Sequence, residues 1–302
     1  MRAPSPDSRI RTYGLLIVVV LIWASYPALN KIAMRDIPPF TLAAFRCTLA
    51  SGILTLLLWR DVGAGEQPIT RADLPGLVVL GVSGITVSTG FFYLAVALTT
   101  ASNAVILTAA TPVMVAVGGH LFFGERLGRL QWTGVGCSAL GVLLTVTRGQ
   151  LRLLEAPPHL GDALAVVGQV AWATYTLYGK RVLTRLSPRA ATTAAYLIGT
   201  AFLIPLAIVL APAFPPPVLT SGTAWAVVVF QGTLGTLSHI WYYRGVQTIG
   251  PSVTAIFMNF QPLAGLLLAM VVVGETISVA QVLGVAAILA GVWMTTRRAD
   301  RR

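Results

Sequence analysis

The chain has 302 residues, of which 56% are hydrophobic and only 10% are charged, and its formal net charge is +11. Soluble domains carry about 25% charged residues, so this composition excludes an ordinary soluble protein. A strongly positive chain can also bind nucleic acid, but in a membrane protein the excess is better explained by Lys and Arg retained in cytoplasmic loops. We therefore expect the partner of this chain to be a lipid bilayer and not a nucleic acid.

Ten stretches have the length and composition of membrane spans, since a spanning helix needs about 20 mostly apolar residues. In chain order they are residues 13–31, 40–59, 74–98, 102–123, 129–147, 161–179, 190–211, 223–243, 251–273 and 278–296. The first stretch follows three arginines and resembles a signal peptide, but the nine spans behind it favour an uncleaved helix. The sequence thus predicts an all-α integral membrane protein with ten transmembrane helices.

Cofactor chemistry finds no support in the sequence. The two cysteines, Cys47 and Cys137, lie inside predicted spans, where they act as small packing residues. The sequence contains no metal-ligand spacing, phosphate-binding loop or nucleotide motif. We expect neither a metal nor an organic cofactor, and no ATP-driven pump.

The second half of the chain repeats the first. The phrase GERLGRLQWTGVG at 124–136 returns as GETISVAQVLGVA at 274–286. Other residues recur 149 or 150 positions apart: Trp23 with Trp172, Tyr26 with Tyr175, Tyr93 with Tyr243, Ser102 with Ser252, and Pro112 with Pro262. The two units, 14–147 and 161–296, each hold five predicted helices. Because five is odd, the second unit must enter the membrane from the opposite side, which makes an inverted repeat, typical of many secondary transporters.

The positive charges predict the orientation of the chain in the membrane. If both termini are cytoplasmic, 16 of the 21 Lys and Arg residues fall in cytoplasmic segments. The outer loops then hold only Lys31, Arg35, Arg148 and Arg152. Positive residues favour the cytoplasmic side, so the sequence predicts two cytoplasmic termini. Opposite topology also explains why the loop at 124–129 keeps two arginines that its copy at 274–279 lacks.

The chain resembles the EamA-like transporters of the drug/metabolite transporter superfamily. The resemblance rests on the two five-helix units, on Trp-Ala-Ser-Tyr at 23–26 and Trp-Ala-Thr-Tyr at 172–175, and on a Gly-Glu pair after the fourth helix of each unit. It implies that helices one to four and six to nine surround a cavity, with helices five and ten outside. It also implies export of amino acids, aromatic or other apolar ones among them, or of related small-molecule metabolites across a bacterial inner membrane by alternating access. Efflux of drugs or toxic cations is the alternative.

Arg46 is the clearest charge inside a predicted span, and intramembrane charges are often functional. It lies six residues after Phe40, or about 9 Å below the outer end of the second helix at about 1.5 Å per residue. A guanidinium can grip a carboxylate at two points, so Arg46 is a candidate anchor or a residue that organises the cavity. The alternative is that it snorkels to the outer interface. Its repeat mate falls at Ala195 or Tyr196, neither of which is charged.

Aromatic and polar residues in the spans are further candidates for a substrate site. Trp23, Tyr26, Trp172 and Tyr175 lie in mid-span, although Trp and Tyr usually gather at the interfaces, so we expect cavity walls, with helix packing as the alternative. Pro112 and Pro262 interrupt helices four and nine, as gating hinges or as static kinks. The remaining expected site residues are Tyr93, His239, Tyr243, Asn259 and Gln261, and Asn103 and Thr111 are weaker candidates.

No proton relay of carboxylates is expected, because all ten acidic residues lie in loops or at the ends of predicted spans. Transport is therefore predicted to run down the substrate gradient. His239 lies deep enough in a span to exchange a proton, although a histidine hydrogen-bonded between helices is the alternative. Glu125 and Glu275 lie beside helix ends, and we expect them to cap or latch helices.

A membrane enzyme is the rival class. The GVSG phrase at 81–84 resembles the serine motif of rhomboid-type proteases, with Ser83 as nucleophile and His239 as base. The five-plus-five repeat argues against it, and we predict that the protein is not an enzyme.

Small residues line one face of helix five and one face of helix ten. They are Gly134, Ser138 and Gly141, and Gly284, Ala287 and Gly291. Such faces permit close helix approach, either within the chain or between two copies in a homodimer.

Overall fold

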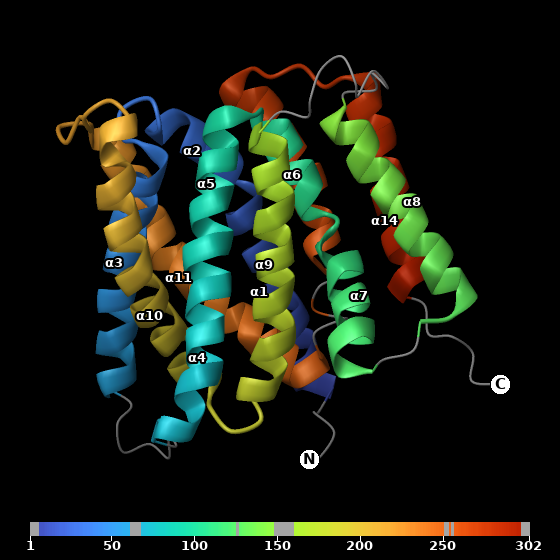
Figure 1. Ribbon diagram of the computed structural model, residues 1–302, viewed down its shortest axis with the longest axis horizontal. Helices are drawn as coiled ribbons and strands as arrows, with labels where there is room; N and C mark the ends of the chain where they lie inside the picture. Colours follow the sequence, from blue (N-terminus) through green and yellow to red (C-terminus); the bar gives the residue numbers. More distant parts are fainter. Residues whose placement is uncertain are drawn as a thin grey trace.

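The computed structural model describes residues 6–60, 68–124, 127–147, 160–250, 254 and 257–296. This part of the chain is helical and contains no strand (Figure 1). Five of its helices are both long and apolar enough to cross a membrane, at Ile10–Ala33, Pro39–Arg60, Arg71–Leu98, Ala101–Phe122 and Pro188–Ala213. The prediction of an all-α membrane protein is confirmed, and the count of ten spans stays a prediction.

The first unit holds one straight span and three interrupted ones before its last helix. Its elements are α1 (Pro6–Ala24), α2 (Tyr26–Ala33), α3 (Pro39–Arg60), η1 (Arg71–Asp73), α4 (Leu74–Leu80), η2 (Gly81–Val87), α5 (Ser88–Leu98), α6 (Ala101–Thr108), α7 (Thr111–Phe123) and α8 (Arg129–Val146). The pairs α1/α2 and α6/α7 are each one span with a break, and α4, the π-helical η2 and α5 form a third span.

The second unit runs in the opposite sense. Its elements are α9 (Leu160–Val182), α10 (Pro188–Leu210), η3 (Ala211–Ala213), α11 (Gly222–Ile249), η4 (Met258–Phe260), α13 (Gln261–Leu268), η5 (Ala269–Val273) and α14 (Val279–Thr296). In Figure 1, α1 runs upward and its counterpart α9 runs downward, as an inverted repeat requires. The first turn of α1 and the last turn of α14 both lie toward the lower end (Figure 1).

Prolines cause the break between α6 and α7 and the matching break before α13, because a proline has no N–H to donate to the carbonyl four residues earlier. Pro112 leaves the carbonyl of Thr108 without that bond, and the Thr111 hydroxyl donates to it instead, at 2.7 Å. At the matching break, the backbone N–H of Gln261 bonds the carbonyl of Met258 in a tighter turn. The predicted interruptions of helices four and nine are confirmed, and their role in gating stays a prediction.

Helices α8 and α14 pack chiefly on each other and stand beside the other helices (Figure 1). Their small residues allow this contact. A Cβ atom on Gly134 would lie 2.6 Å from the carbonyl oxygen of Gly291, and one on Gly141 would lie 2.6 Å from that of Gly284. The small-residue faces therefore pair within the chain. A homodimer through α8 or α14 would have to use their other faces, and it stays a prediction.

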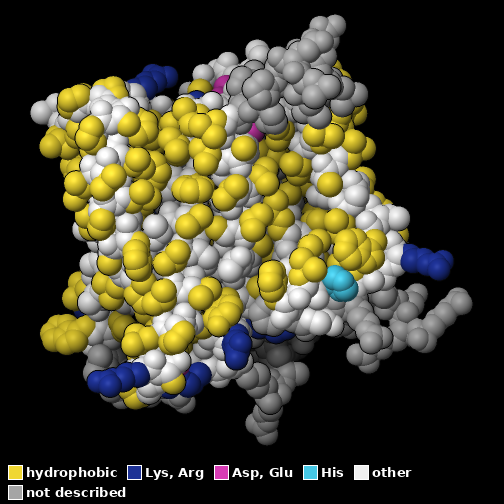
Figure 2. Space-filling model, in the orientation of Figure 1, with side chains coloured by type: hydrophobic (Ala, Val, Ile, Leu, Met, Phe, Trp, Pro, Cys, Tyr) yellow, Lys and Arg dark blue, Asp and Glu magenta, His cyan; other side chains and the backbone are white. Residues whose placement is uncertain are grey.

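The surface divides into an apolar band and two polar ends. Figure 2 shows apolar side chains over most of the visible face, with Lys and Arg gathered mainly at the lower end. Arg60, Arg71 and Arg181 belong to elements that end or begin there, and Arg185 lies in the turn after α9 (Figure 1). This end matches the predicted cytoplasmic side.

Candidate functional site

A cavity of about 90 Å³ lies at the centre of the molecule, between the two units. It is lined by Trp23, Tyr26, Arg46, Ser88, Thr89, Phe92, Tyr93, Thr108, Thr111, Gln169, Trp172, His239, Met258 and Gln261. Both proline breaks contribute matched positions to the wall, because Thr108 and Met258 are repeat mates, as are Thr111 and Gln261. The two breaks thus place matched residues of both units around one space.

The structure brings most of the predicted site residues to this cavity. Those that line it are Trp23, Tyr26, Arg46, Tyr93, Trp172, His239 and Gln261, together with the weaker candidate Thr111. Tyr175 and Tyr243 lie behind the wall, where their rings stack with centroids 4.7 Å apart. A role of these two residues in substrate binding stays a prediction. The side chain of Asn259 lies outside the described part of the chain.

The two tryptophans of the repeated phrase meet at the cavity. Their rings pack edge to face with centroids 5.2 Å apart. The indole N–H of Trp23 donates to Ser238 at 2.5 Å, which fixes its ring. The ring of His239 lies 5.0 Å from Trp23 and 5.5 Å from Trp172. One wall of the cavity is therefore a rigid aromatic surface contributed by both units.

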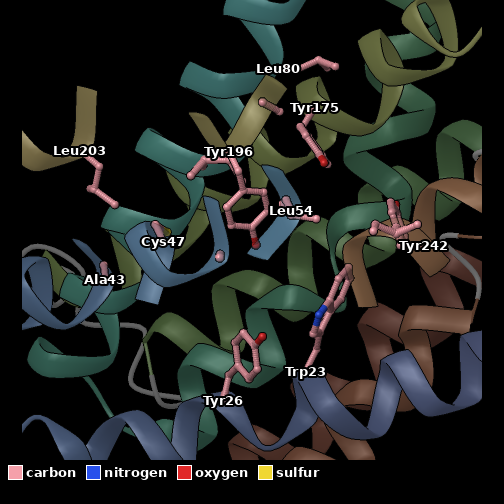
Figure 3. Packing of buried hydrophobic residues seen from close by; sticks show 14 of the residues in the cluster. Trp23, Tyr26, Ala43, Cys47, Leu54, Leu80, Tyr175, Tyr196, Leu203 and Tyr242 are labelled. Atoms are coloured by element: carbon pink, nitrogen blue, oxygen red, sulfur yellow. The ribbon is translucent and has the colours of Figure 1, made fainter. Parts of the chain in front are cut away.

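Arg46 also lines the cavity, and only 2% of its surface is exposed. Its guanidinium carbon lies 5.9, 5.6 and 6.0 Å from the ring centroids of Tyr26, Tyr93 and Tyr196, respectively. Its two terminal nitrogens donate to the hydroxyls of Tyr196 and Thr89, each at 3.3 Å. Figure 3 shows Trp23, Tyr26 and Tyr196 pointing toward a common space. The snorkelling alternative is wrong, because the side chain stays inside the bundle.

The charge of Arg46 has no anionic counterpart in the described residues. No carboxylate of that part of the chain lies within ion-pair distance of it, and its Nε has no hydrogen-bond partner there. Aromatic rings and hydroxyls stabilise a cation only partly, by about 0.5–2 kcal/mol per ring. Burying an unpaired charge costs several kcal/mol, so the site favours an anion beside Arg46.

Buried polar groups hold the wall around Arg46 in place. The Tyr93 hydroxyl donates to the side-chain oxygen of Gln231, whose amide group donates to Asn30 at 2.9 Å. Elsewhere in the cavity wall, the Thr111 hydroxyl lies 2.7 Å from the side-chain oxygen of Gln169. These contacts fix the rings and the amides that face the cavity.

Thr89 and Gln169 are site residues that sequence reasoning missed. Each is a polar residue in the middle of an apolar span, which is the signal that would have found it. Thr89 is less conspicuous than an intramembrane charge, because a threonine hydroxyl can bond within its own helix.

The carboxylates of Asp162 and Glu275 belong to a polar cluster at the upper end in Figure 1, which we call the polar cap. Glu275 accepts hydrogen bonds from the backbone N–H groups of Ala101 and Ser102 at 2.8 and 2.9 Å, at the start of α6. Asp162 accepts from the Thr99 hydroxyl at 2.6 Å and from the Asn103 amide at 3.2 Å. The prediction that Glu275 caps a helix is confirmed. The Asn103 side chain bonds Asp162 in the polar cap and does not line the cavity. Glu125 lies outside the described residues.

The protease alternative finds no support in the geometry of the GVSG phrase. Ser83 donates its hydroxyl to the carbonyl of Val79 at 2.6 Å, one turn back in its own helix. Its glycine neighbours are packing residues, since a Cβ atom on Gly84 would lie 2.2 Å from the ring of Tyr175. His239 faces the cavity, and Ser83 does not line it.

Known proteins resemble this chain over almost its whole length. An uncharacterized transporter of Archaeoglobus fulgidus is 32% identical over 95% of this chain and 98% of its own. The uncharacterized inner membrane transporter YedA of Escherichia coli is 24% identical, over 94% of this chain and 90% of its own. A crystal structure with a TM-score of 0.67 and 21% identity covers 95% of this chain and 98% of that one, so the fold is shared.

The sequence pattern of one family matches each unit separately. The matched residues are 10–147 and 159–297, and the pattern is that of the EamA-like transporter family. The two matches fall on the two units that the structure shows running in opposite directions. The chain belongs to the EamA-like transporter family, and it is a membrane transporter.

Proposed function

We propose that this protein exports small amino acids from the cytoplasm as a secondary transporter of the bacterial inner membrane. The observation that carries the proposal is Arg46, a buried cation that faces the central cavity without an anionic partner in the described residues. A substrate carboxylate supplies the missing charge, and the guanidinium can bind it at two points. The same fixed charge repels a free cation, which disfavours efflux of cationic drugs.

The rest of the wall suits the other parts of an amino acid. The rings of Trp23 and Trp172 offer an apolar surface to its side chain. The ammonium group can donate hydrogen bonds to the side chains of Gln169 and Gln261 and to the Nδ1 of His239, since all three residues line the same cavity. That Nδ1 is buried and has no hydrogen-bond partner among the described residues. The cavity therefore offers both halves of a zwitterion a partner.

The size of the cavity sets the size of the substrate. A water molecule needs about 10–15 Å³ of cavity volume measured in this way. The cavity of about 90 Å³ then has room for about six to nine non-hydrogen atoms, the size range of alanine to leucine. Aromatic amino acids would require the cavity to widen.

The proposal includes alternating access by two inverted units of five membrane-spanning helices each, with both termini in the cytoplasm. No Asp or Glu lines the cavity within the part of the chain that the structure describes. The carboxylates of Asp162 and Glu275 are engaged by hydrogen bonds in the polar cap. We therefore expect transport down the substrate gradient, without an obligatory ion gradient.

A solute screen on reconstituted vesicles tests the function. Vesicles with purified protein are loaded with radiolabelled amino acids, nucleobases or cationic drugs, and efflux is followed with and without a pH gradient; protein-free vesicles are the control. We expect efflux of small apolar amino acids without any gradient of ions. Efflux of cationic drugs alone would overturn the substrate class, and amino acid flux that requires a pH gradient would overturn the coupling.

Cysteine labelling tests the topology. A cysteine at Gly149, a position in the predicted outer loop, should react with an impermeant thiol reagent in intact cells. One at Ser187, in the basic loop between α9 and α10, should react only after the cells are opened. The reverse pattern would contradict the proposed orientation, whatever the substrate.

A further inference from the structure

A second cavity, larger than the central one, lies between α7, α8 and α9. Its volume is about 700 Å³, and apolar residues such as Val113, Val117, Val142, Val170 and Leu177 line it. It extends along the lower half of α9, from Val170 to Arg181 at the lower end in Figure 1. We call this space the side groove.

The side groove exists because α8 pairs with α14 and leaves α9 uncovered on one side. A wall of packed side chains separates it from the central cavity. In this wall Val115 and Met114 of α7 pack against Ala173 and Leu177 of α9. The groove is therefore a different site from the one proposed to hold the substrate.

The groove lies at the depth of the hydrocarbon of the bilayer. Leu121 and Phe122, at its rim, are 65% and 80% exposed, as side chains that face lipid are. Water in an apolar space at this depth would lack hydrogen-bond partners. By the measure used for the central cavity, about 10–15 Å³ for each non-hydrogen atom, a volume of about 700 Å³ has room for roughly 50–70 such atoms. A phospholipid acyl chain therefore fits in the groove.

The lower end of the groove carries a positive charge. Arg181 lines it, is exposed, and holds its guanidinium carbon 6.0 Å from the ring centroid of Tyr178. Lys180 is its exposed neighbour in the last turn of α9. Because these residues lie at the predicted cytoplasmic side, they face the leaflet that carries anionic headgroups.

We propose that the side groove binds one acyl chain of an anionic phospholipid from the cytoplasmic leaflet, with the headgroup phosphate on Arg181. The lipid fills the space between α8 and α9 and supports α7 from behind. The inference uses the proposed topology for the leaflet, and it does not depend on the substrate.

Thermal unfolding of the purified protein in a neutral detergent tests the headgroup. Phosphatidylglycerol and phosphatidylcholine with the same acyl chains are added in matched amounts at low salt. We expect phosphatidylglycerol to raise the melting temperature by more than phosphatidylcholine does. Arg181→Gln should weaken the apparent affinity for phosphatidylglycerol about fivefold, the effect of one basic residue near a headgroup. Arg244→Gln removes an exposed charge outside the groove and should leave that affinity unchanged.

Native mass spectrometry tests the acyl-chain site separately. Ala139 lines the groove and is exposed, so Ala139→Phe fills the space without entering the packed core. We expect this variant to unfold at the same temperature as the native protein in detergent alone and to retain one fewer phosphatidylglycerol. Any of three results would overturn the proposal. The two lipids could raise the melting temperature equally, Arg244→Gln could weaken the affinity for phosphatidylglycerol as much as Arg181→Gln does, or Ala139→Phe could retain all of its phosphatidylglycerol.

Discussion

The central cavity and the polar cap both hold charge away from water, but they satisfy it in opposite ways. In the cap, Asp162 is fully buried and Glu275 is tied to the start of α6, and each carboxylate has donors from the chain itself. In the cavity, Arg46 is almost as deeply buried, yet the described residues offer it no carboxylate. A charge with complete partners serves the fold. We propose that the charge of Arg46, which lacks its counterpart, receives one from a ligand.

The largest expected effect is on transport, from Arg46→Ala. A hydrogen bond to a charged group is worth about 1.5–3 kcal/mol, so amino acid efflux from vesicles should fall at least about tenfold. Arg46→Lys should recover only part of the loss, because an ammonium lacks the planar two-point grip. Both variants should insert into the membrane, since alanine enters a bilayer more readily than arginine and lysine carries the same charge as arginine. If a correctly inserted Arg46→Ala variant shows normal efflux, the charge in the cavity does not bind substrate, and the contrast between the central cavity and the polar cap is wrong.

The next effect is on stability, from Glu275→Ala in the cap. This change leaves two backbone N–H groups and the Ser102 hydroxyl without their acceptor. We expect the free energy of unfolding to fall by about 2 kcal/mol, measured by denaturant titration in detergent micelles. Glu275→Gln should lose less, because an amide oxygen still accepts a bond. The order of preference among substrates should not change, and a changed preference would make the cap part of the binding site.

A loss of stability of similar size should follow from Gly134→Ala, where α8 meets α14. The new Cβ atom would lie 2.5 Å from the Thr295 hydroxyl and 2.6 Å from a backbone oxygen, so the two helices must separate. Overpacking of this kind costs about 1–3 kcal/mol. Gly136→Ala on the same helix is the matched control, since no atom lies within 4 Å of its added Cβ. Equal melting temperatures for the two variants would show that the α8–α14 contact is not tight.

The smallest effect should come from Tyr196→Phe. The change removes one hydroxyl that accepts a bond from Arg46 at 3.3 Å and keeps the aromatic ring beside the guanidinium. Loss of one such bond, at about 1 kcal/mol, should raise the concentration for half-maximal efflux about fivefold. A loss as large as that of Arg46→Ala would mean that Tyr196, and not the guanidinium alone, contacts the substrate.

Much of the architecture could be predicted from the sequence, because hydropathy marks spans and a repeat marks symmetry. Pro112 and Pro262 indicated the breaks that line the cavity, and Arg46 stood out as the clearest charge inside a span. The break at Ser25 and the π-helical segment at 81–87 were not predicted. Both depend on local hydrogen bonding, which hydropathy does not report.

The face that each helix turns toward the cavity was harder to predict than the residues at which the helix crosses the membrane. A helix that is apolar all round has no amphipathic stripe to show which face is buried. Tyr175 and Tyr243 were therefore assigned to the cavity, although they stack behind its wall. Gln169, one turn before Trp172 in the same span, was overlooked for the same reason. Side-chain contacts between distant helices decide such cases, and the sequence alone does not contain them.

Isothermal titration calorimetry with leucine and leucinamide tests the role of Arg46 most directly. The two ligands share a side chain and an amino group, but only leucine carries a carboxylate. The native protein should bind leucine at least about tenfold more tightly, and Arg46→Gln should bind both alike, because the charge-assisted contact is gone. If the native protein binds both with equal affinity, or if Arg46→Gln keeps the preference for leucine, Arg46 does not anchor a carboxylate.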